Sequence, residues 1–473
     1  MKERLHFIGI GGSGMLPLAV LARKKGYAVS GSDRSISDEK ILWLEKSGIH
    51  IYKKPDKENL ANCDIAIFST AISPEHPEKQ EAVKLSADKK LKIMHRMDFL
   101  NFLVAEDSVR IGIAGTHGKT STSSMFGHVL LELGYDPTII VGGKPLYLPD
   151  GVRSGKSGIS VFETDESDGS FLTSNANLKI CLNVDNDHLE YYGDMKNLND
   201  AFSKFVIGSD LTALSGNDDV LGKINRDHCV HYFESRELPE ACNANDGVKY
   251  YGIFTNNSDS LEVYRLETER TYLGEISLRI PGRHFATNAL SIIALLDRAV
   301  SLGYLNSENY SPEKAIGALN SFPGVSRRIE KIARINSADV YDDYGHHPSE
   351  IRAVIQALRG RLSEEGRLYV VFQPHRYSRT GEHYREFAEN LEQADHVFLL
   401  PLYSAGEKPR EGISSAMIGD AMKTKYSLIQ DGDFQSIFDK SHPGDIFLFQ
   451  GAGSISDQVR KYLKTAKQTT VLF

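Results

Sequence analysis

Two glycine-rich stretches of this 473-residue chain have the residue types and spacing of phosphate-binding loops. In the first, "GIGGSGM" at residues 9–15, Gly9, Gly11 and Gly14 fit G-x-G-x-x-G after an apolar run. Glycines at this spacing let the backbone approach a diphosphate at a helix N-terminus. Asp33 lies 19 residues beyond Gly14, about where an acid that binds ribose belongs in a dinucleotide site. The alternative for Asp33 is a turn or helix N-cap residue.

The second stretch, "GTHGKTS" at residues 115–121, follows the apolar run "VRIGIA" and opens a helical pattern. In such a loop Lys119 contacts the β- and γ-phosphates and Thr120 offers its hydroxyl to Mg2+. The strict motif has glycine at 113, where this chain has Ile113, so the pattern predicts a shorter variant. The alternative is a helix N-terminus with a surface lysine. The residues predicted at ATP here are Gly115, Thr116, His117, Gly118, Lys119, Thr120 and Ser121.

The elements around these loops alternate between strand and helix patterns. Such alternation predicts an α/β fold with parallel sheets covered by helices. We expect three domains: a Rossmann-like one over 1–107, a central P-loop ATPase-like one with an extra β segment over 108–321, and a C-terminal Rossmann-like one over 322–473. "SFPGVSRR" at 321–328 is typical of a hinge. The long helix expected over 281–303 closes the central domain.

Composition limits the partners that the chain can have. A net charge of −8 argues against a general nucleic-acid surface. No C-x-x-C pair occurs among the four cysteines, so neither a zinc site nor a disulfide framework is predicted, and a reducing cytoplasm is the simplest compartment. The uncharged run at residues 5–22 is interrupted by glycines and a proline, and a strand–turn–helix pattern explains it better than a signal peptide. We expect no membrane partner.

Nine segments in their order along the chain resemble the Mur ligase family. They are "GIGGSGM", "GTHGKTS", "ETDESDGSF", "DNDHLEYYG", "GRHFATNAL", "FPGVSRRIE", "YDDYGHHPSEI", "QPHRYSRT" and "AGEKP". The resemblance spans nearly the whole chain and is carried by the set, since any one segment is weak evidence. It implies ATP-dependent joining of L-alanine to the lactyl carboxylate of UDP-N-acetylmuramate, through an acyl phosphate, in peptidoglycan synthesis and hence in cell wall biogenesis, cell shape and division.

The resemblance also assigns the first loop to the UDP-sugar rather than to a nicotinamide dinucleotide. "STAIS" at 69–73 resembles the family's second contact loop. The residues implied at the UDP-sugar are Gly11, Gly12, Ser13, Gly14, Met15, Asp33, Ser69, Thr70 and Ala71.

Two ions, Mg2+ or Mn2+, are implied at the second loop, with Thr120, Glu163 and His188 as ligands. His188 could instead be a local hydrogen-bond partner. The other acids of "ETDESDGSF", Asp165, Glu166 and Asp168, could form a solvated turn.

Further ATP contacts are implied for His284 and Asn288, and Asn288 could instead be a helix-surface amide. Phe285 departs from the family pattern, which commonly has Asn at that position. "SRR" would supply Arg327 or Arg328 to the γ-phosphate on domain closure, since a guanidinium suits a transferring phosphoryl group.

The C-terminal segments complete the implied site. Asp343 resembles the residue at the ATP ribose. Two segments at the carboxyl ends of strands, where open α/β sheets bind ligands, are implied to form the L-alanine pocket. Its residues are Tyr344, His346, His375, Arg376 and Arg379. The alternative is a basic surface patch. Lys119, Glu163, His188, Arg327 and His346 are the implied catalytic set.

Three other functions stay open on the sequence alone. Within the same family, a ligase that attaches a murein tripeptide shares "GTHGKT" and "HHP". A nicotinamide-dependent oxidoreductase would use the first loop and a P-loop regulatory switch the second. We expect a monomer or a homodimer.

Overall fold

The computed structural model describes residues 2–187, 189–239, 247–255, 259–439, 441–466 and 470–472. The chain forms two compact units. The first comprises Met1–Thr255, Leu261–Ser277 and Thr287–Phe322, and the second Asn256–Ser260, Leu278–Ala286 and Pro323–Phe473.

The first unit begins with a parallel sheet of five strands in the order β3-β2-β1-β4-β5. The strands are β1 (Arg4–Ile8), β2 (Ala28–Ser32), β3 (His50–Tyr52), β4 (Ile65–Phe68) and β5 (Lys92–His95). The helices are α1 (Met15–Lys24), α2 (Asp38–Lys46), α3 (Pro77–Ala87) and α4 (Arg96–Leu103), with a 3-10 turn, η1, at Lys57–Leu60.

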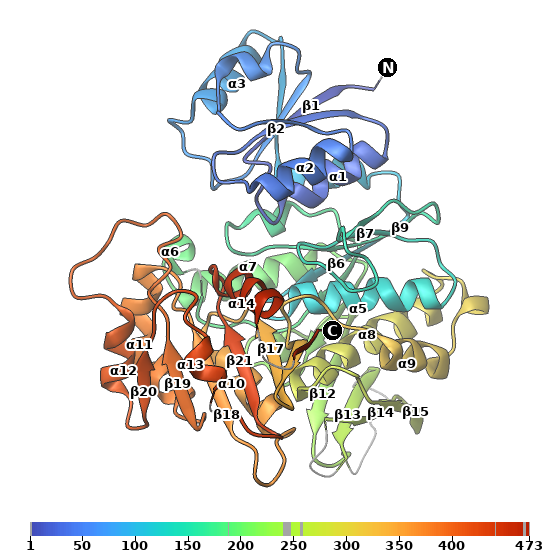
Figure 1. Cartoon of the computed structure of the whole chain (residues 1–473). Helices are drawn as coiled ribbons and strands as arrows, with labels where there is room; N and C mark the ends of the chain where they lie inside the picture. Colours follow the sequence, from blue (N-terminus) through green and yellow to red (C-terminus); the bar gives the residue numbers. More distant parts are fainter. Residues whose placement is uncertain are drawn as a thin grey trace. The chain divides into compact units, whose positions relative to one another are not determined.

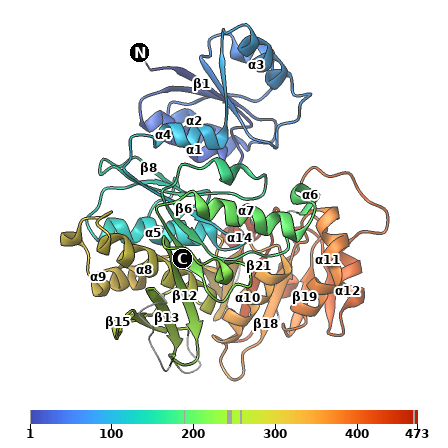
Figure 2. The ribbon, with the colours of Figure 1, turned by 180° about the vertical axis from the view of Figure 1, so that it is seen from behind.

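The helices cover both faces of this sheet (Figure 1). α1, α2 and α4 contribute to a large apolar core that includes Phe7, Leu21 and Phe99, and α1 packs beside α4 (Figure 2). α3 buries Ala82 in a smaller core with Ala66 of β4. The uncharged run at 5–22 is therefore a buried strand, a turn and a helix.

The second sheet of the first unit has ten strands in the order β15-β14-β13-β12-β11-β10-β6-β9-β7-β8. They are β6 (Val109–Ala114), β7 (Thr138–Ile140), β8 (Val152–Arg153), β9 (Ile159–Glu163), β10 (Leu178–Cys181), β11 (Leu211–Ser215), β12 (Cys229–Ser235), β13 (Lys249–Phe254), β14 (Leu261–Leu266) and β15 (Arg270–Ile276). Pairing is parallel except at β7–β8, β13–β14 and β14–β15.

The helices of this part are α5 (Lys119–Glu132), α6 (Leu189–Tyr192), α7 (Met195–Ile207), α8 (Arg283–Ser301) and α9 (Pro312–Ser321), with 3-10 turns η2 (Ser170–Thr173), η3 (Leu221–Lys223) and η5 (Ser307–Asn309). α5 is buried although its first turns are rich in Ser and Thr. The hydroxyls of Thr122, Ser123 and Ser124 donate to carbonyls one turn earlier, at 2.6–2.9 Å. These bonds satisfy the hydroxyls inside the core.

The second unit holds a seven-stranded sheet in the order β20-β19-β18-β21-β17-β16-β22. Its strands are β16 (Glu330–Ile335), β17 (Ala338–Asp343), β18 (Leu368–Phe372), β19 (His396–Leu399), β20 (Tyr426–Leu428), β21 (Ile446–Gln450) and β22 (Thr470–Leu472). Its helices are α10 (Pro348–Arg359), α11 (Tyr377–Leu391), α12 (Ser415–Ala421), α13 (Gln435–Phe438) and α14 (Ile455–Thr465). β16 pairs antiparallel with both of its neighbours, and the other pairs are parallel.

Three α/β sheets, with an added antiparallel segment in the central one, confirm the predicted fold class. β15 ends at Ile276, and beyond it Leu278 and Ile280 pack against the core of the second unit. Among helices of the described residues, none is long and apolar enough to span a membrane. The domain boundaries given above stay predictions.

A buried carboxylate ties α8 to the antiparallel segment of the first unit. Asp297 of α8, 5% exposed, accepts hydrogen bonds from Tyr250 Oη at 2.5 Å, Arg265 Nη1 at 3.0 Å and Tyr310 Oη at 2.9 Å. Three donors from different segments therefore depend on one acceptor.

We expect Asp297→Ala to lower the free energy of unfolding by about 3 kcal/mol, because it leaves a cation and two hydroxyls without their acceptor. Tyr310→Phe removes a single donor and should cost about 1 kcal/mol. Urea unfolding followed by far-UV circular dichroism would measure both changes. Equal effects of the two variants would contradict a shared acceptor.

Candidate active site

The first glycine-rich loop joins β1 to α1 and is held by backbone bonds. Gly9, with φ of +76°, donates its N–H to the Ser32 carbonyl at 2.8 Å. Gly11 N–H donates to Asp33 Oδ2 at 3.0 Å, and Asp33 Oδ1 accepts from the backbone N–H and hydroxyl of Ser35 at 2.8 and 3.0 Å. Asp33 is therefore a turn residue, as in the alternative given above, and it also fixes the loop.

The residues predicted at the UDP-sugar all line one cavity of about 410 Å³. They are Gly11, Gly12, Ser13, Gly14, Met15, Asp33, Ser69, Thr70 and Ala71. Arg96, Asp165 and Asp168 line the same cavity. The fold thus brings together the loops that follow β1, β2, β4 and β9, although binding by these residues stays a prediction.

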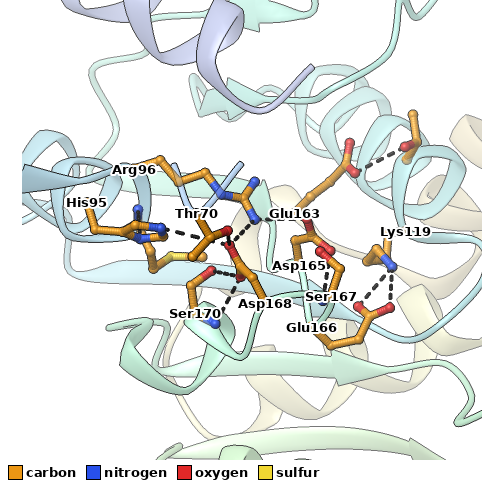
Figure 3. A network of polar contacts seen from close by, with 12 residues as sticks. Thr70, His95, Arg96, Lys119, Glu163, Asp165, Glu166, Ser167, Asp168 and Ser170 are labelled. Atoms are coloured by element: carbon orange, nitrogen blue, oxygen red, sulfur yellow. Dashed lines mark hydrogen bonds and ion pairs between the residues drawn. The ribbon is translucent and has the colours of Figure 1, made fainter. Parts of the chain in front are cut away.

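Arg96 is a cation that lines this cavity beside the glycine-rich loop, and the sequence analysis missed it. Its side chain is 15% exposed and directly follows β5 as the first residue of α4. A Cβ added to Gly14 would lie 2.5 Å from Arg96 Nη1, so the guanidinium covers the N-terminus of α1. Its Nη2 donates to Asp165 Oδ2 at 2.8 Å and lies 3.6 Å from Asp168 Oδ2 (Figure 3). The available signal was its place at the carboxyl end of a parallel strand.

The acids of the turn after β9 are paired with other segments: Glu166 is buried, and Asp165 and Asp168 are partly buried, so a fully solvated turn does not describe them. Glu166 has no exposed surface. Asp168 Oδ2 accepts from Thr70 Oγ1 at 2.6 Å, and Asp168 Oδ1 accepts from Ser170 N–H at 3.0 Å (Figure 3). The turn can be buried because cations and hydroxyls surround its carboxylates.

The charges in this network stabilise one another. Burial alone would raise the pKa of Asp165, but the Lys119 and Arg96 cations outweigh it and hold that pKa well below its ordinary range. Burial alone would lower the pKa of Lys119, but Glu166, Asp165 and Glu163 outweigh it and raise that pKa. Asp165 is therefore ionised and Lys119 is a cation at neutral pH.

Lys119 opens α5 and is placed to hold an anion. Its Nζ donates to both Glu166 carboxylate oxygens at 2.9 Å (Figure 3). It also donates to the Gly115 carbonyl at 2.7 Å and to the Thr116 carbonyl at 3.2 Å. Nζ contacts both oxygens of one carboxylate. Two oxygens of a phosphate could contact it in the same way.

The loop before Lys119 is pinned by the segment after β10. Asn183 Oδ1 accepts from His117 N–H at 2.8 Å, and Asn183 Nδ2 donates to the His117 carbonyl at 3.1 Å. His117 Nε2 lies 2.9 Å from Asp185 Oδ2. Gly118 has φ of +88°, and a Cβ there would lie 2.6 Å from Asn288 Nδ2. Asn288 of α8 therefore packs against this loop, where it was predicted at ATP.

Two predicted metal ligands lie side by side at the start of α5. Thr120 Oγ1 donates to Glu163 Oε2 at 3.0 Å, and Glu163 Oε1 accepts from Gly142 N–H at 2.7 Å. A hydroxyl and a carboxylate are hard oxygen donors that fit Mg2+. His188, the third predicted ligand, lies outside the described residues.

A second cavity of about 220 Å³ connects the two loops. Lys119 and Glu163 line it, and it shares Ser13, Gly14, Arg96 and Asp165 with the first cavity. A ligand at the first loop can therefore extend to the second within one unit.

In the second unit, the two predicted arginines flank one ring. The guanidinium carbons of Arg327 and Arg328 lie 4.8 and 5.2 Å from the centroid of the Tyr344 ring. Asp343 is buried, and its carboxylate accepts from Ile329 N–H at 2.9 Å and Gly345 N–H at 2.7 Å. These bonds hold the Asp343 carboxylate within its own domain, so its contact with ribose stays a prediction.

The residues predicted at L-alanine form one cluster. The Tyr344 and His346 rings are 5.4 Å apart, and the His346 and His375 rings 5.8 Å. Arg376 precedes α11 with φ of +71°, and Arg379 lies in the first turn of that helix. The strand ends after β17 and β18 thus meet as expected for an open α/β sheet.

Burial sets the charge of the imidazoles in this unit. It lowers the pKa of His284 to about 4, and with the charges of His346, Arg379 and Arg376 it lowers the pKa of His375 to about 4. Burial also lowers the pKa of His346. At neutral pH the imidazoles of His284, His346 and His375 are therefore uncharged.

Phe285, the position that departs from the family pattern, is 4% exposed in the apolar core of the second unit. A polar role for it is therefore not supported.

Three family models match the chain in succession. Residues 4–107 match the model described as "Mur ligase family, catalytic domain", 113–296 the "Mur ligase middle domain" and 327–453 the "Mur ligase, glutamate ligase domain".

Curated relatives match over nearly their full length. A UDP-N-acetylmuramate–L-alanine ligase of Pelotomaculum thermopropionicum is 36% identical over 479 residues, which cover 99% of this chain and 98% of the relative. The ligase of the same name from Desulfatibacillum aliphaticivorans is 34% identical over 467 residues, 96% of each chain.

Solved structures share the fold. A UDP-N-acetylmuramate–alanine ligase from Thermotoga maritima has a TM-score of 0.80 and 28% identity, covering 98% of this chain and 99% of that one. A murein peptide ligase from Psychrobacter arcticus has a TM-score of 0.66 and 21% identity, covering 98% of each chain, and shows likeness of fold alone.

The lowered pKa values of His284 and His375 predict a loss of stability in acid. Between about pH 6.5 and 4 the unfolded imidazoles bind protons that the folded ones exclude, so stability falls as the pH falls through this window. His284→Gln/His375→Gln should therefore show a smaller drop in melting temperature between pH 7.5 and 5 than the wild type. Differential scanning calorimetry at both pH values measures this, and an unchanged drop would contradict it.

Proposed function

The chain belongs to the Mur ligase family, and we propose that it joins L-alanine to the lactyl carboxylate of UDP-N-acetylmuramate, converting ATP to ADP and phosphate. Neither a nicotinamide-dependent oxidoreductase nor a nucleotide switch accounts for both phosphate loops together with the arginine and histidine cluster of the second unit. Because the chain belongs to a ligase family, we set aside both the oxidoreductase and the nucleotide switch.

The observation that carries the proposal is the pair of cavities that share Ser13, Gly14, Arg96 and Asp165. A diphosphate at the N-terminus of α1 would meet backbone N–H groups and the Arg96 guanidinium. The sugar of the same molecule could then extend into the cavity lined by Lys119 and Glu163. One substrate would thus place its carboxylate beside the ATP loop.

In the first step, the carboxylate attacks the γ-phosphorus of ATP, and the bond from phosphorus to the β-phosphate oxygen breaks. The products are ADP and an acyl phosphate. Lys119 would hold the β- and γ-phosphate oxygens with its charge, and Thr120 and Glu163 would hold the divalent ion. When bound, that ion neutralises charge on the phosphate oxygens.

In the second step, the amine of L-alanine attacks the acyl carbon, a C–N bond forms and inorganic phosphate leaves. The amine loses a proton, and the neutral His346 imidazole is a candidate to accept it. Arg376 or Arg379 would pair with the carboxylate of L-alanine, because a guanidinium forms two parallel hydrogen bonds to it.

L-Alanine is favoured over a murein tripeptide as the acceptor substrate. Relatives that match the full chain at 34–36% identity carry the name of the L-alanine ligase, whereas the murein peptide ligase of known structure is 21% identical. We further propose a cytoplasmic location, where UDP-sugars and ATP are available. A monomeric or homodimeric state and a second metal ion stay predictions.

We expect release of ADP and phosphate with ATP, Mg2+, UDP-N-acetylmuramate and L-alanine, and a loss of at least about 1,000-fold in Lys119→Ala because the phosphates lose their buried cation. A coupled ADP assay measures both. Parallel reactions with L-Ala-D-Glu-diaminopimelate in place of L-alanine test the alternative ligase. Turnover only with the tripeptide would overturn the choice of L-alanine.

Arg96→Gln should raise the KM for UDP-N-acetylmuramate about tenfold or more, because the diphosphate loses a charge-assisted partner. The KM for ATP should change by less than about threefold, since Lys119 remains. Lys92→Gln removes an exposed charge from the preceding strand, β5, and serves as the matched control. Steady-state kinetics on both variants test this, and an unchanged KM for the sugar nucleotide in Arg96→Gln would contradict the role of Arg96.

A further inference from the structure

The segment that carries the two predicted arginines has a strained backbone. Arg327 and Ile329 have φ of +61° and +46°, in the left-handed region that side chains with a Cβ disfavour. Such a conformation persists only where the surrounding structure holds it. Arg328 lies between these two residues, so the direction of its side chain depends on whatever holds the segment.

Carboxylates hold this segment on both sides. Glu330 Oε2 accepts from Arg327 N–H at 2.7 Å and from Ser326 Oγ at 2.9 Å. Asp343 Oδ2 accepts from Ile329 N–H at 2.9 Å. The Arg327 carbonyl accepts from Tyr344 N–H at 2.8 Å. The strained turn is thus fixed through Glu330 and the end of β17.

Arg460 of α14 bridges Glu330, one of the two acids that hold the turn, to Asp342 at the end of β17. Its Nη2 donates to Glu330 Oε2 at 2.5 Å and to Asp342 Oδ2 at 2.9 Å. Asp342 has no exposed surface, also accepts from Ser456 Oγ, and lies 3.9 Å from Arg327 Nε through its other oxygen. A buried carboxylate without a cation is costly, and Arg460 is the cation that hydrogen-bonds to both Glu330 and Asp342, so it holds the two acids together.

The two arginines of the turn have different surroundings. Arg327 Nη2 donates to the Gly451 carbonyl at 2.6 Å, which commits this guanidinium to its own domain. The Arg328 guanidinium has no hydrogen-bond or ion-pair partner among the residues that the structure describes, and lies 5.2 Å from the Tyr344 ring. Arg328 is therefore the member of the pair that is available to a phosphate.

We propose that Arg460 is a positioning residue for the ligase reaction: by bridging Glu330 and Asp342 it fixes the strained turn and thereby the direction of the Arg328 guanidinium, which the family resemblance gives as a candidate for the γ-phosphate. This inference rests on the proposed function. Arg460 lies beyond residues 327–453, where the C-terminal family model matches, so that match does not include it.

The test compares Arg460→Gln with Lys461→Gln, which removes the same charge from the adjacent, exposed position of α14. In Arg460→Gln we expect kcat to fall about tenfold or more, because Arg328 no longer has a fixed direction in the transition state. The KM for UDP-N-acetylmuramate should change less than twofold, because the residues that line its predicted cavity belong to the first unit. A kcat for Arg460→Gln within twofold of that of Lys461→Gln would overturn the proposal.

A double-mutant cycle separates positioning from a general loss of structure. In an Arg328→Gln background, Arg460→Gln should lower kcat by less than about twofold further, because its effect acts through Arg328. A full, multiplicative loss would overturn the proposal.

Arg460→Lys keeps the charge but loses the two-carboxylate bridge, and it decides the matter if Arg460→Gln does not fold. Its kcat should lie between those of Arg460→Gln and the wild type, at least about threefold below the latter, and a wild-type kcat would overturn the proposal. Wild-type turnover with L-alanine is measured first. A silent wild type overturns the proposed function itself, whereas a defect confined to the variants concerns Arg460 alone.

Discussion

The first unit depends on one acidic turn whose neighbouring residues hold two cations, one beside each glycine-rich loop. Asp165 pairs with Arg96, which covers the first loop, and Glu166 pairs with Lys119 of the second (Figure 3). Neither carboxylate could be buried without its cation, and neither cation would keep its direction without its carboxylate. The electrostatics of this turn therefore fix the spacing between the two glycine-rich loops, where the diphosphate and the triphosphate are predicted to bind.

This arrangement follows from the topology of two parallel sheets. The loops after β1, β4 and β5 supply one side of the first cavity, and the loop after β9 supplies the other. Carboxyl ends of parallel strands gather at one edge of a sheet, where helix N-termini attract anions. Here two such edges belong to one compact unit. A chain that bound only a dinucleotide would need only one such edge.

Features that depend on the spacing of neighbouring residues could be predicted from the sequence. Features that depend on partners far away in the chain could not. The two glycine loops and the strand-end arginines and histidines were visible, because each motif is a run of neighbouring residues in a strand–turn–helix context. Arg96 was missed because a single arginine after a strand carries no motif, and its partner Asp165 lies 69 positions away. "TDESD" reads as exposed from its composition, since burial of its acids depends on cations from other segments. The placement of His188 is not described, and the roles of the site residues remain predictions.

In the second unit, the charges of the residues predicted at L-alanine limit the kinds of ligand that this cluster can bind. Histidines with lowered pKa values are neutral at physiological pH, so they cannot act as fixed cations for a carboxylate. The guanidinium groups of Arg376 and Arg379 are predicted to take that task. A neutral imidazole among fixed guanidinium groups can still accept a proton, and the positive field around it favours release of that proton afterwards. An amino acid, which presents a carboxylate and must lose a proton from its amine, needs both kinds of group, whereas a simple anion would need only the arginines.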